Sequence, residues 1–273
     1  MKAKGVEDFF EFPVGNVLLW KSMALGNVSY GQKMKPRCCK GRAIPLVFIV
    51  AILLLLFSCT IYGRFAKKFI AHHAAQIGKS EQLIFATNRD SSSSVVTIHT
   101  VERYNGVWQI VLPEFAGSIG ERGFAAIGDK REGDGKSPSG IFRLGIVFGY
   151  DPSVATKMPY RQATEDDFWV DDANSEDYNT WVKGKPNAAS WEKMRRDDDQ
   201  YKYGVVIEYN TEPIVKGNGS AIFLHVWKDG GPTLGCVSMP EEMVLKIIGW
   251  LDPAKKPLII MGTESELRAM RPR

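Results

Sequence analysis

Two residues in the C-terminal half of the chain have side chains and a spacing suited to nucleophilic catalysis. His225 lies near the end of the apolar stretch GSAIFLHVW, and Cys236 follows eleven residues later. The turn-forming residues 228–232 between them let the chain reverse, so we expect the imidazole to lie within hydrogen-bond reach of the sulfur. Such a base would convert the thiol into a nucleophilic thiolate. The alternative is a structural role, with a small buried cysteine beside a hydrogen-bonded core histidine.

The residues on either side of Cys236 favour the catalytic interpretation. Residues 238–241 (SMPE) match a capping box, and apolar residues recur at helical spacing through residues 243–251, which predicts a helix that begins just after Cys236. The positive end of that helix would face the sulfur and lower the pKa of the thiol. Gly235 has no side chain, so we expect a sharp turn there, with backbone amides at Gly235 and Cys236 that bind the oxyanion of an acyl intermediate.

A long apolar segment separates the N-terminal region from the rest of the chain. Residues 43–63 carry no charge, and their number matches the roughly 20 apolar residues needed to span a bilayer. Basic residues are more numerous before the segment than after it, which favours a cytoplasmic N-terminus. We therefore predict an N-terminal transmembrane helix that leaves the C-terminal part outside the cytoplasm. A lipoprotein signal is the alternative, because residues 56–59 (LFSC) resemble a cleavage box with Cys59 as the lipidated residue.

The distribution of cysteines gives Cys236 further weight. The other three cysteines, Cys38, Cys39 and Cys59, lie within or before the apolar segment. The part predicted to be exported therefore contains one thiol and cannot form an internal disulfide. An exported protein keeps such a thiol either fully buried or for chemistry.

Neither a metal, a cofactor nor a nucleic acid is expected. The four histidines do not have the spacing of a zinc site around the single exported cysteine; they are His72, His73, His99 and His225. The net charge of +4 includes the basic cluster around the apolar segment, and the rest alternates acidic and basic stretches. Residues 134–140 (DGKSPSG) lack the spacing of a phosphate-binding loop and are predicted to form a turn.

The pattern of the exported part predicts a mainly β fold with a few helices. Short β-branched or aromatic runs bounded by turn residues are expected to be strands, at residues 82–87, 94–102, 107–112, 140–144, 204–209, 221–227 and 257–261. Asn105 and Gly106 suit the positive φ angles of a tight hairpin turn between two of these runs. Residues 151–200 are too long for a simple connection and are expected to form a partly ordered insertion beside the sheet.

We divide the chain into five segments: residues 1–42, a cytoplasmic tail or start-site extension; 43–63, the anchor or lipoprotein signal; 64–81, a juxtamembrane linker; 82–262, the catalytic domain; and 263–273, a C-terminal tail. The insertion carries acidic clusters at residues 165–167, 171–172 and 197–199. These clusters are expected to be solvated surface, with recognition of a substrate amine as the alternative.

Three segments together resemble the L,D-transpeptidase catalytic-domain (YkuD-like) family: GSAIFLHVW, PTLGCVSM and EGDGKSPSGIFRLGIVFGY. The resemblance covers roughly residues 82–262 and implies a β-sandwich-like fold. It identifies Cys236 as the nucleophile, His225 as the general acid and base, and Gly235 as the motif glycine. It also places Thr233 where a Ser or Thr carbonyl orients the histidine. It puts Lys136 and Arg143 near the active-site face, where either could contact the substrate.

The resemblance further implies a function in the bacterial cell envelope. Cys236 would attack the third residue of a peptidoglycan tetrapeptide stem, release D-Ala and form a thioester. An amine acceptor makes the protein a transpeptidase, water makes it an L,D-carboxypeptidase, and a chain without turnover would be a peptidoglycan-binding protein. Many members carry a His before the motif glycine, where this chain has Leu234, and many carry an Arg where it has Ser238. Both departures concern how the substrate and the acceptor are bound.

Overall fold

The structure is a computed structural model that describes residues 63–271 of the 273-residue chain. The predicted membrane segment lies outside these residues except for Gly63, as does the lipidation candidate Cys59. None of the helices within residues 63–271 is long and apolar enough to cross a membrane.

Most of the ordered elements are strands, as the sequence predicts. Thirteen strands are described: β1 (Gln82–Asn88), β2 (Val95–Tyr104), β3 (Val107–Ile110), β4 (Phe115–Ser118), β5 (Gly140–Gly149), β6 (Tyr160–Gln162), β7 (Asp167–Val170), β8 (Trp181–Lys183), β9 (Trp191–Lys193), β10 (Tyr203–Ile207), β11 (Phe223–Val226), β12 (Val237–Met239) and β13 (Leu258–Thr263). Residues 63–72 are helical, and the further helices are α2 (Ala74–Ile77), α3 (Glu241–Trp250), the 3-10 turn η1 (Pro253–Lys255) and α4 (Glu264–Ala269).

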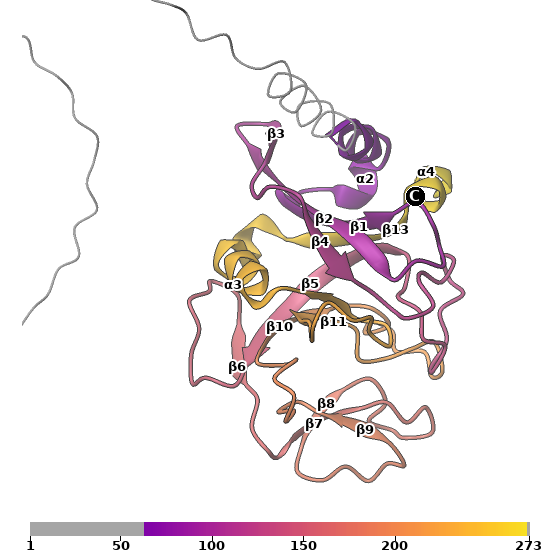
Figure 1. The fold of residues 1–273 in the computed structure, drawn as a ribbon, viewed down its shortest axis with the longest axis vertical. Helices are drawn as coiled ribbons and strands as arrows, with labels where there is room; N and C mark the ends of the chain where they lie inside the picture. The colour runs from indigo at the N-terminus through magenta and orange to yellow at the C-terminus, as the bar shows by residue number, and fades with distance from the viewer. Residues whose placement is uncertain (1–62, 272–273) are drawn as a thin grey trace, which may run out of the picture. The chain divides into compact units, whose positions relative to one another are not determined.

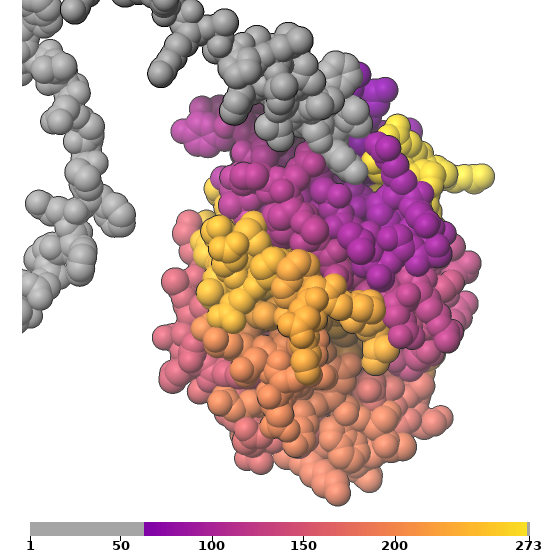
Figure 2. Space-filling model, in the orientation of Figure 1, coloured from indigo at the N-terminus to yellow at the C-terminus, as the bar shows by residue number. Residues whose placement is uncertain are grey.

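The larger sheet closes on itself. Its order is β1-β13-β5-β10-β11-β12-β4-β2-β3, and β1 also pairs directly with β2, so the path returns to its first strand (Figure 1). Parallel pairs β1–β13 and β11–β12 interrupt the otherwise antiparallel ladder along this path. Closure leaves β3 and β6, which pair only with β2 and β5, as the edge strands of this sheet. In Figure 2 the yellow and orange C-terminal segments lie directly beside the indigo and magenta N-terminal ones, as this ring requires.

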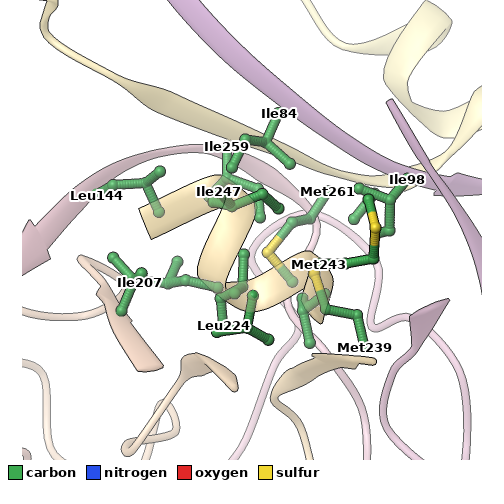
Figure 3. Packing of buried hydrophobic residues seen from close by; sticks show 14 of the residues in the cluster. Ile84, Ile98, Leu144, Ile207, Leu224, Met239, Met243, Ile247, Ile259 and Met261 are labelled. Carbon is green, nitrogen blue, oxygen red and sulfur yellow. The ribbon is translucent and has the colours of Figure 1, made fainter. Parts of the chain in front are cut away.

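The core of the ring is built around α3. This helix contacts β10 and β11, and its buried residues Met243 and Ile247 lie among Leu224, Ile259 and Met261 of the strands (Figure 3). The apolar spacing in residues 243–251 therefore identified the helix and its buried face correctly.

The start of α3 differs from the prediction. Ser238 does not cap a helix: it lies in β12, fully buried, in register with Ser118 of β4 and His225 of β11. The N-cap position is Pro240, which makes no side-chain cap bond. The capping-box pattern was wrong because pairing between β11 and a short strand kept residues 237–239 extended, an interaction that local sequence cannot reveal.

Local turn chemistry was predicted well at the first hairpin. Asn105 and Gly106 have φ angles of 49° and 80° and connect β2 to β3. By contrast, the predicted strand at residues 221–227 is shorter, because Ala221 has a φ of 52° and leaves the extended region.

Residues 151–200 form an ordered unit with its own three-stranded sheet, in the order β8-β7-β9. Its aromatic residues pack on the main sheet: the ring centroid of Trp169 lies 4.9 Å from that of Phe223 in β11. The Trp169 indole also donates a 3.0 Å hydrogen bond to Asn179. The insertion is therefore one wall of the region that surrounds β11.

Both ends of the described chain pack together in an apolar cluster that is separate from the core around α3. Phe65 and Phe69, from the helical residues 63–72, are buried against Phe85 of β1 and Leu267 of α4. Residues that the sequence analysis assigned to a linker and a tail thus contribute to a second apolar cluster.

Candidate functional site

The parallel pairing of β11 and β12 brings the two predicted catalytic residues to one face of the sheet. His225 lies opposite Ser238, and Leu224 lies opposite Val237, so Cys236 comes one step earlier, beside Phe223. Because side chains alternate along a strand, Cys236 points to the same face as His225. The two residues are diagonal neighbours on adjacent strands.

The sulfur of Cys236 is held by the backbone of the chain segment before His225. The thiol donates to the carbonyl of Ala221 over 3.2 Å, and the sulfur accepts from the amide of Phe223 over 3.3 Å. Only 6% of the residue is exposed, and this burial raises the pKa of Cys236 to about 12. The resting group is therefore a thiol.

The predicted helix end does not offset this burial. Helix α3 begins at Glu241, after the three residues of β12. Extended residues advance about 3.3 Å each, so the three residues of β12 separate Cys236 from the first turn of α3 by roughly 10 Å along the chain. Helix-end effects fall off within one turn. The expectation of a helix that faces the sulfur was wrong.

His225 is a neutral, buried imidazole. Its Nδ1 lies 2.7 Å from the carbonyl of Val226, and since a carbonyl only accepts, Nδ1 carries the proton and Nε2 is the unprotonated nitrogen. Burial lowers the pKa of His225 to about 4. The side-chain bonds of His225 and Cys236 go to backbone groups, so the two side chains share a face without a direct hydrogen bond in this conformation.

The loop that carries Cys236 is braced by two hydroxyls. Thr233 Oγ1 donates to the Cys236 carbonyl over 2.8 Å and accepts from the Gly235 amide over 3.1 Å. Ser137 Oγ, fully buried, donates to the Gly235 carbonyl over 2.6 Å and accepts from the Gly120 amide over 3.0 Å. The Gly235 amide predicted to bind an oxyanion is thus already occupied by Thr233.

Other details of this loop bear on the predicted roles of Gly235 and Thr233. A Cβ on Gly235 would stand 3.1 Å from both Ile222 Cδ1 and the Lys136 carbonyl, so the close packing explains the glycine. The Thr233 carbonyl accepts from the Glu121 amide over 2.8 Å, whereas Nδ1 of His225 is bonded to Val226. An orienting role of the Thr233 carbonyl stays a prediction.

A cleft of about 400 Å³ opens over these residues. His225, Cys236, Gly235 and Thr233 all line it, together with Leu234, which is 76% exposed. The remaining charged lining residues are Glu121, Lys130, Glu132, Asp171, Glu192 and Arg196. Both cations are already paired, Lys130 with Asp134 and Arg196 with Asp198.

Only one residue of the three acidic clusters in the insertion lines the cleft, namely Asp171. Asp167 is buried with Arg161 and Lys183, and Asp198 is held by Arg196. Most of these carboxylates therefore have structural partners.

Arg143 lies away from the cleft. It borders a different hollow and pairs over 2.8 Å with Glu212. The basic residue suggested as a substrate contact at Arg143 is therefore not part of this site, and Lys136 approaches the site through its backbone carbonyl.

Three residues of the site were missed by the sequence analysis: Ser137, Glu192 and Tyr201. Tyr201 packs its ring against His225, with centroids 5.1 Å apart, and its hydroxyl is hydrogen-bonded to Glu192 Oε2. Ser137 stood in a segment recognised only as a turn. Glu192 and Tyr201 come from the insertion and its exit, where no motif distinguishes them from the surrounding polar residues.

The described residues do not suggest a metal centre. Within residues 63–271 no group of three or more His, Cys, Asp or Glu side chains is arranged to hold a metal ion. The free groups at the cleft are instead a thiol, an imidazole and carboxylates, which suit acyl transfer and recognition of a cationic ligand.

Comparison with known proteins identifies the family of this chain. The sequence matches the L,D-transpeptidase catalytic domain (YkuD) family over residues 111–260, more than half of the chain. No curated protein matches it. Among solved structures it is similar to the helical cell shape determining protein Pgp2 from Campylobacter jejuni, at 15% identity and a TM-score of 0.35, over 69% of this chain and 53% of that one. The chain thus spans about half the length of that structure.

Proposed function

The chain belongs to the L,D-transpeptidase catalytic domain family, and on that premise we propose that it is a peptidoglycan L,D-transpeptidase in which Cys236 is the nucleophile and His225 the general acid and base. The family acts on peptidoglycan in the cell envelope. The observation that carries the proposal is the placement of Cys236 and His225 on one face of adjacent strands, at the bottom of one cleft.

The proposed reaction begins with proton transfer. When the substrate displaces the thiol from the Ala221 carbonyl, the thiol proton passes to the unprotonated Nε2 of His225. The thiolate then attacks the carbonyl of the third stem residue, a diaminopimelate-type residue. The tetrahedral intermediate expels the D-Ala amine, which takes the proton from His225, and a thioester forms.

The second half transfers the acyl group. An amine from another stem attacks the thioester, His225 accepts its proton and returns it to the sulfur, and an amide bond and the free thiol result. With water as the acceptor the same steps release a shortened stem, which would be L,D-carboxypeptidase activity. Leu234 is exposed at the cleft, at the position where many relatives carry a His. No imidazole is therefore present at that position to bind the acceptor.

A binding protein without turnover is the second candidate. It is favoured by the protonated state of Cys236 and by the absence of a Cys236–His225 hydrogen bond in this conformation. Its cleft would hold the stem peptide, with the thiol as an inert part of the wall.

The two candidates are separated by one experiment on the full-length chain. Wild type incubated with tetrapeptide muropeptides is expected to release D-Ala and to accumulate a thioester adduct, detected by mass spectrometry. Cys236→Ala should abolish both, whereas the matched variant Cys38→Ala should retain both. Turnover by Cys236→Ala would refute the proposed mechanism, and binding without turnover by wild type would establish the second candidate.

We also propose that the N-terminal segment tethers the domain outside the cytoplasm. The support is the uncharged run at residues 43–63 and its flanking charges. Mass analysis of the protein extracted from membranes should show either an intact segment or a diacylglyceryl group on Cys59. Recovery of the whole protein in the soluble fraction without either would contradict the tether.

A further inference from the structure

Two ionisable side chains that line the cleft beside Cys236, Tyr201 and Glu192, form a pair that the proposed mechanism does not use. Tyr201 is 4% exposed and belongs to the same buried cluster as Cys236. Its hydroxyl donates a hydrogen bond to Glu192 Oε2, and Tyr201, Glu192 and Cys236 all line the same cleft. The ring also packs edge-on against His225 and Phe223.

The charges around this pair leave Glu192 without a cation of its own. Arg196 lies over the Tyr201 ring at 5.1 Å, but its guanidinium makes two hydrogen bonds to Asp198, at 2.9 and 2.7 Å. Burial is the main cause that raises the pKa of Glu192, to about 6; the negative charges of Asp171 and Glu132 add to this rise, while the Tyr201 hydrogen bond and the charge of Arg196 oppose it. At neutral pH the carboxylate is therefore largely ionised.

We propose that Tyr201 and Glu192 are positioning residues that set the protonation state of Cys236: the Glu192 carboxylate, which lines the same cleft as the sulfur, keeps the thiol protonated, and loss of that negative charge releases it. The inference deepens the proposed function, since it concerns the same thiol.

Two physical effects act in the same direction. A carboxylate and a thiolate enclosed in one low-dielectric site repel each other, and the charge of Glu192 accordingly raises the pKa of Cys236. The Tyr201 hydroxyl also has a single proton. While Glu192 is ionised, that proton is drawn to the carboxylate; when Glu192 is neutral, the hydroxyl can donate to the sulfur and stabilise the thiolate.

The test measures the thiol directly and needs no peptidoglycan substrate. The full-length chain and its variants are alkylated with iodoacetamide between pH 6 and 10, and modification of Cys236 is followed by mass spectrometry of the tryptic peptide of residues 229–246. Because the thiolate fraction changes about tenfold for each unit of thiol pKa, Glu192→Gln is expected to react about tenfold faster or more at pH 7.5. Its rate–pH curve should move to lower pH.

The second variant separates this role from a structural one. Tyr201→Phe is expected to react several-fold more slowly than wild type, because Glu192 loses the hydrogen bond that disperses its charge. Adding Glu192→Gln to Tyr201→Phe should raise the rate by less than Glu192→Gln raises it in the wild-type background, because only the repulsion is then removed and no hydroxyl can donate to the sulfur. A merely structural role would alter access to the thiol equally at all pH values and leave the curve in place. The matched controls Tyr203→Phe and Glu241→Gln, whose side chains pair with Asp151 and Lys202, should follow wild type.

An unchanged or slower rate for Glu192→Gln, with an unshifted curve, would overturn the proposal. If that variant does not fold, Tyr201→Phe decides alone: alkylation at the wild-type rate and pH dependence would also overturn it. Failure of muropeptide turnover with the expected alkylation results would remove the proposed function and leave this control of the thiol intact.

Discussion

Replacing Ser137 by alanine should loosen the loop that carries Cys236. The hydroxyl of Ser137 joins three backbone groups from distant parts of the chain: it accepts from the Gly120 amide and donates to the carbonyls of Gly235, at 2.6 Å, and Cys236, at 3.3 Å. Alanine fits the same space but leaves the Gly120 amide and the Gly235 carbonyl without this partner.

The magnitude follows from those lost bonds. Each buried backbone group left without a partner costs about 1–3 kcal/mol, and partial access of water to the cleft offsets some of this, so we expect a loss of about 2–4 kcal/mol in the free energy of unfolding. For a domain of this size, 1 kcal/mol corresponds to roughly 2–4 °C in Tm. Ser137→Ala should therefore unfold roughly 5–15 °C below wild type.

Activity should fall by more than stability explains. Below the unfolding transition, a displaced Cys236 carbonyl shifts the sulfur away from its attack position, and such misplacement typically costs tenfold or more in rate. Differential scanning calorimetry and D-Ala release at 25 °C measure the two effects. Ser153→Ala, at an exposed serine, is the matched control and should change stability by less than about 0.5 kcal/mol. A Ser137→Ala protein that melts within 2 °C of wild type, and releases D-Ala equally fast, would refute the role of this brace.

Three further predictions concern charge, backbone and cleft. Burial holds the pKa of His225 at about 4, below its usual 6.5, so its contribution to stability is present above pH 6.5 and is lost, by about 3 kcal/mol, as the pH falls towards 4. In urea unfolding between pH 4 and 7, the free energy of unfolding of His225→Gln should therefore depend less on pH than that of wild type, and an equal dependence would contradict this. Gly123→Ala would put a Cβ 1.9 Å from the Ser91 carbonyl oxygen at a φ of 73°, whereas Gly184→Ala, at a φ of 80°, meets no atom within 4 Å. Thermal melts should therefore show several kcal/mol lost for Gly123→Ala and only about 1 kcal/mol for Gly184→Ala, and similar losses would count against the packing argument. Leu234→Ala should leave the Tm unchanged, since the side chain is 76% exposed, but raise KM for muropeptides; an unchanged KM would remove Leu234 from substrate contact.

The sequence identifies the parts of this site that depend on local chemistry. The strand that carries His225, the turn at residues 228–232 and the apolar face of α3 are visible as patterns of residue type and spacing. The mainly β class and the Asn105–Gly106 hairpin follow for the same reason, because turn residues act through their own φ angles.

The parts that depend on pairing between distant segments could not be predicted. Ser238 reads as a helix cap in the sequence, but the ladder with β11 makes it a buried strand residue. Glu192 and Tyr201 line the same cleft as Cys236 only because the insertion folds back as an ordered sheet against β11. The pKa of Cys236 follows from this burial, so the sequence-based expectation of an activated thiolate was wrong for the resting state.

The resting geometry indicates how a reactive thiol and a stable protein are compatible in one chain. The bonds of the sulfur to Ala221 and Phe223, together with the bond of the Gly235 amide to Thr233, occupy the proposed nucleophile and one of the two amides predicted to bind an oxyanion. Attack therefore requires a local change in residues 233–236, which the substrate must induce when it enters the cleft. Since the thiolate is the form that oxidises readily, a buried thiol that stays protonated until then is protected between turnovers. The same contacts that make Cys236 unreactive at rest would thus confine its reactivity to the substrate complex.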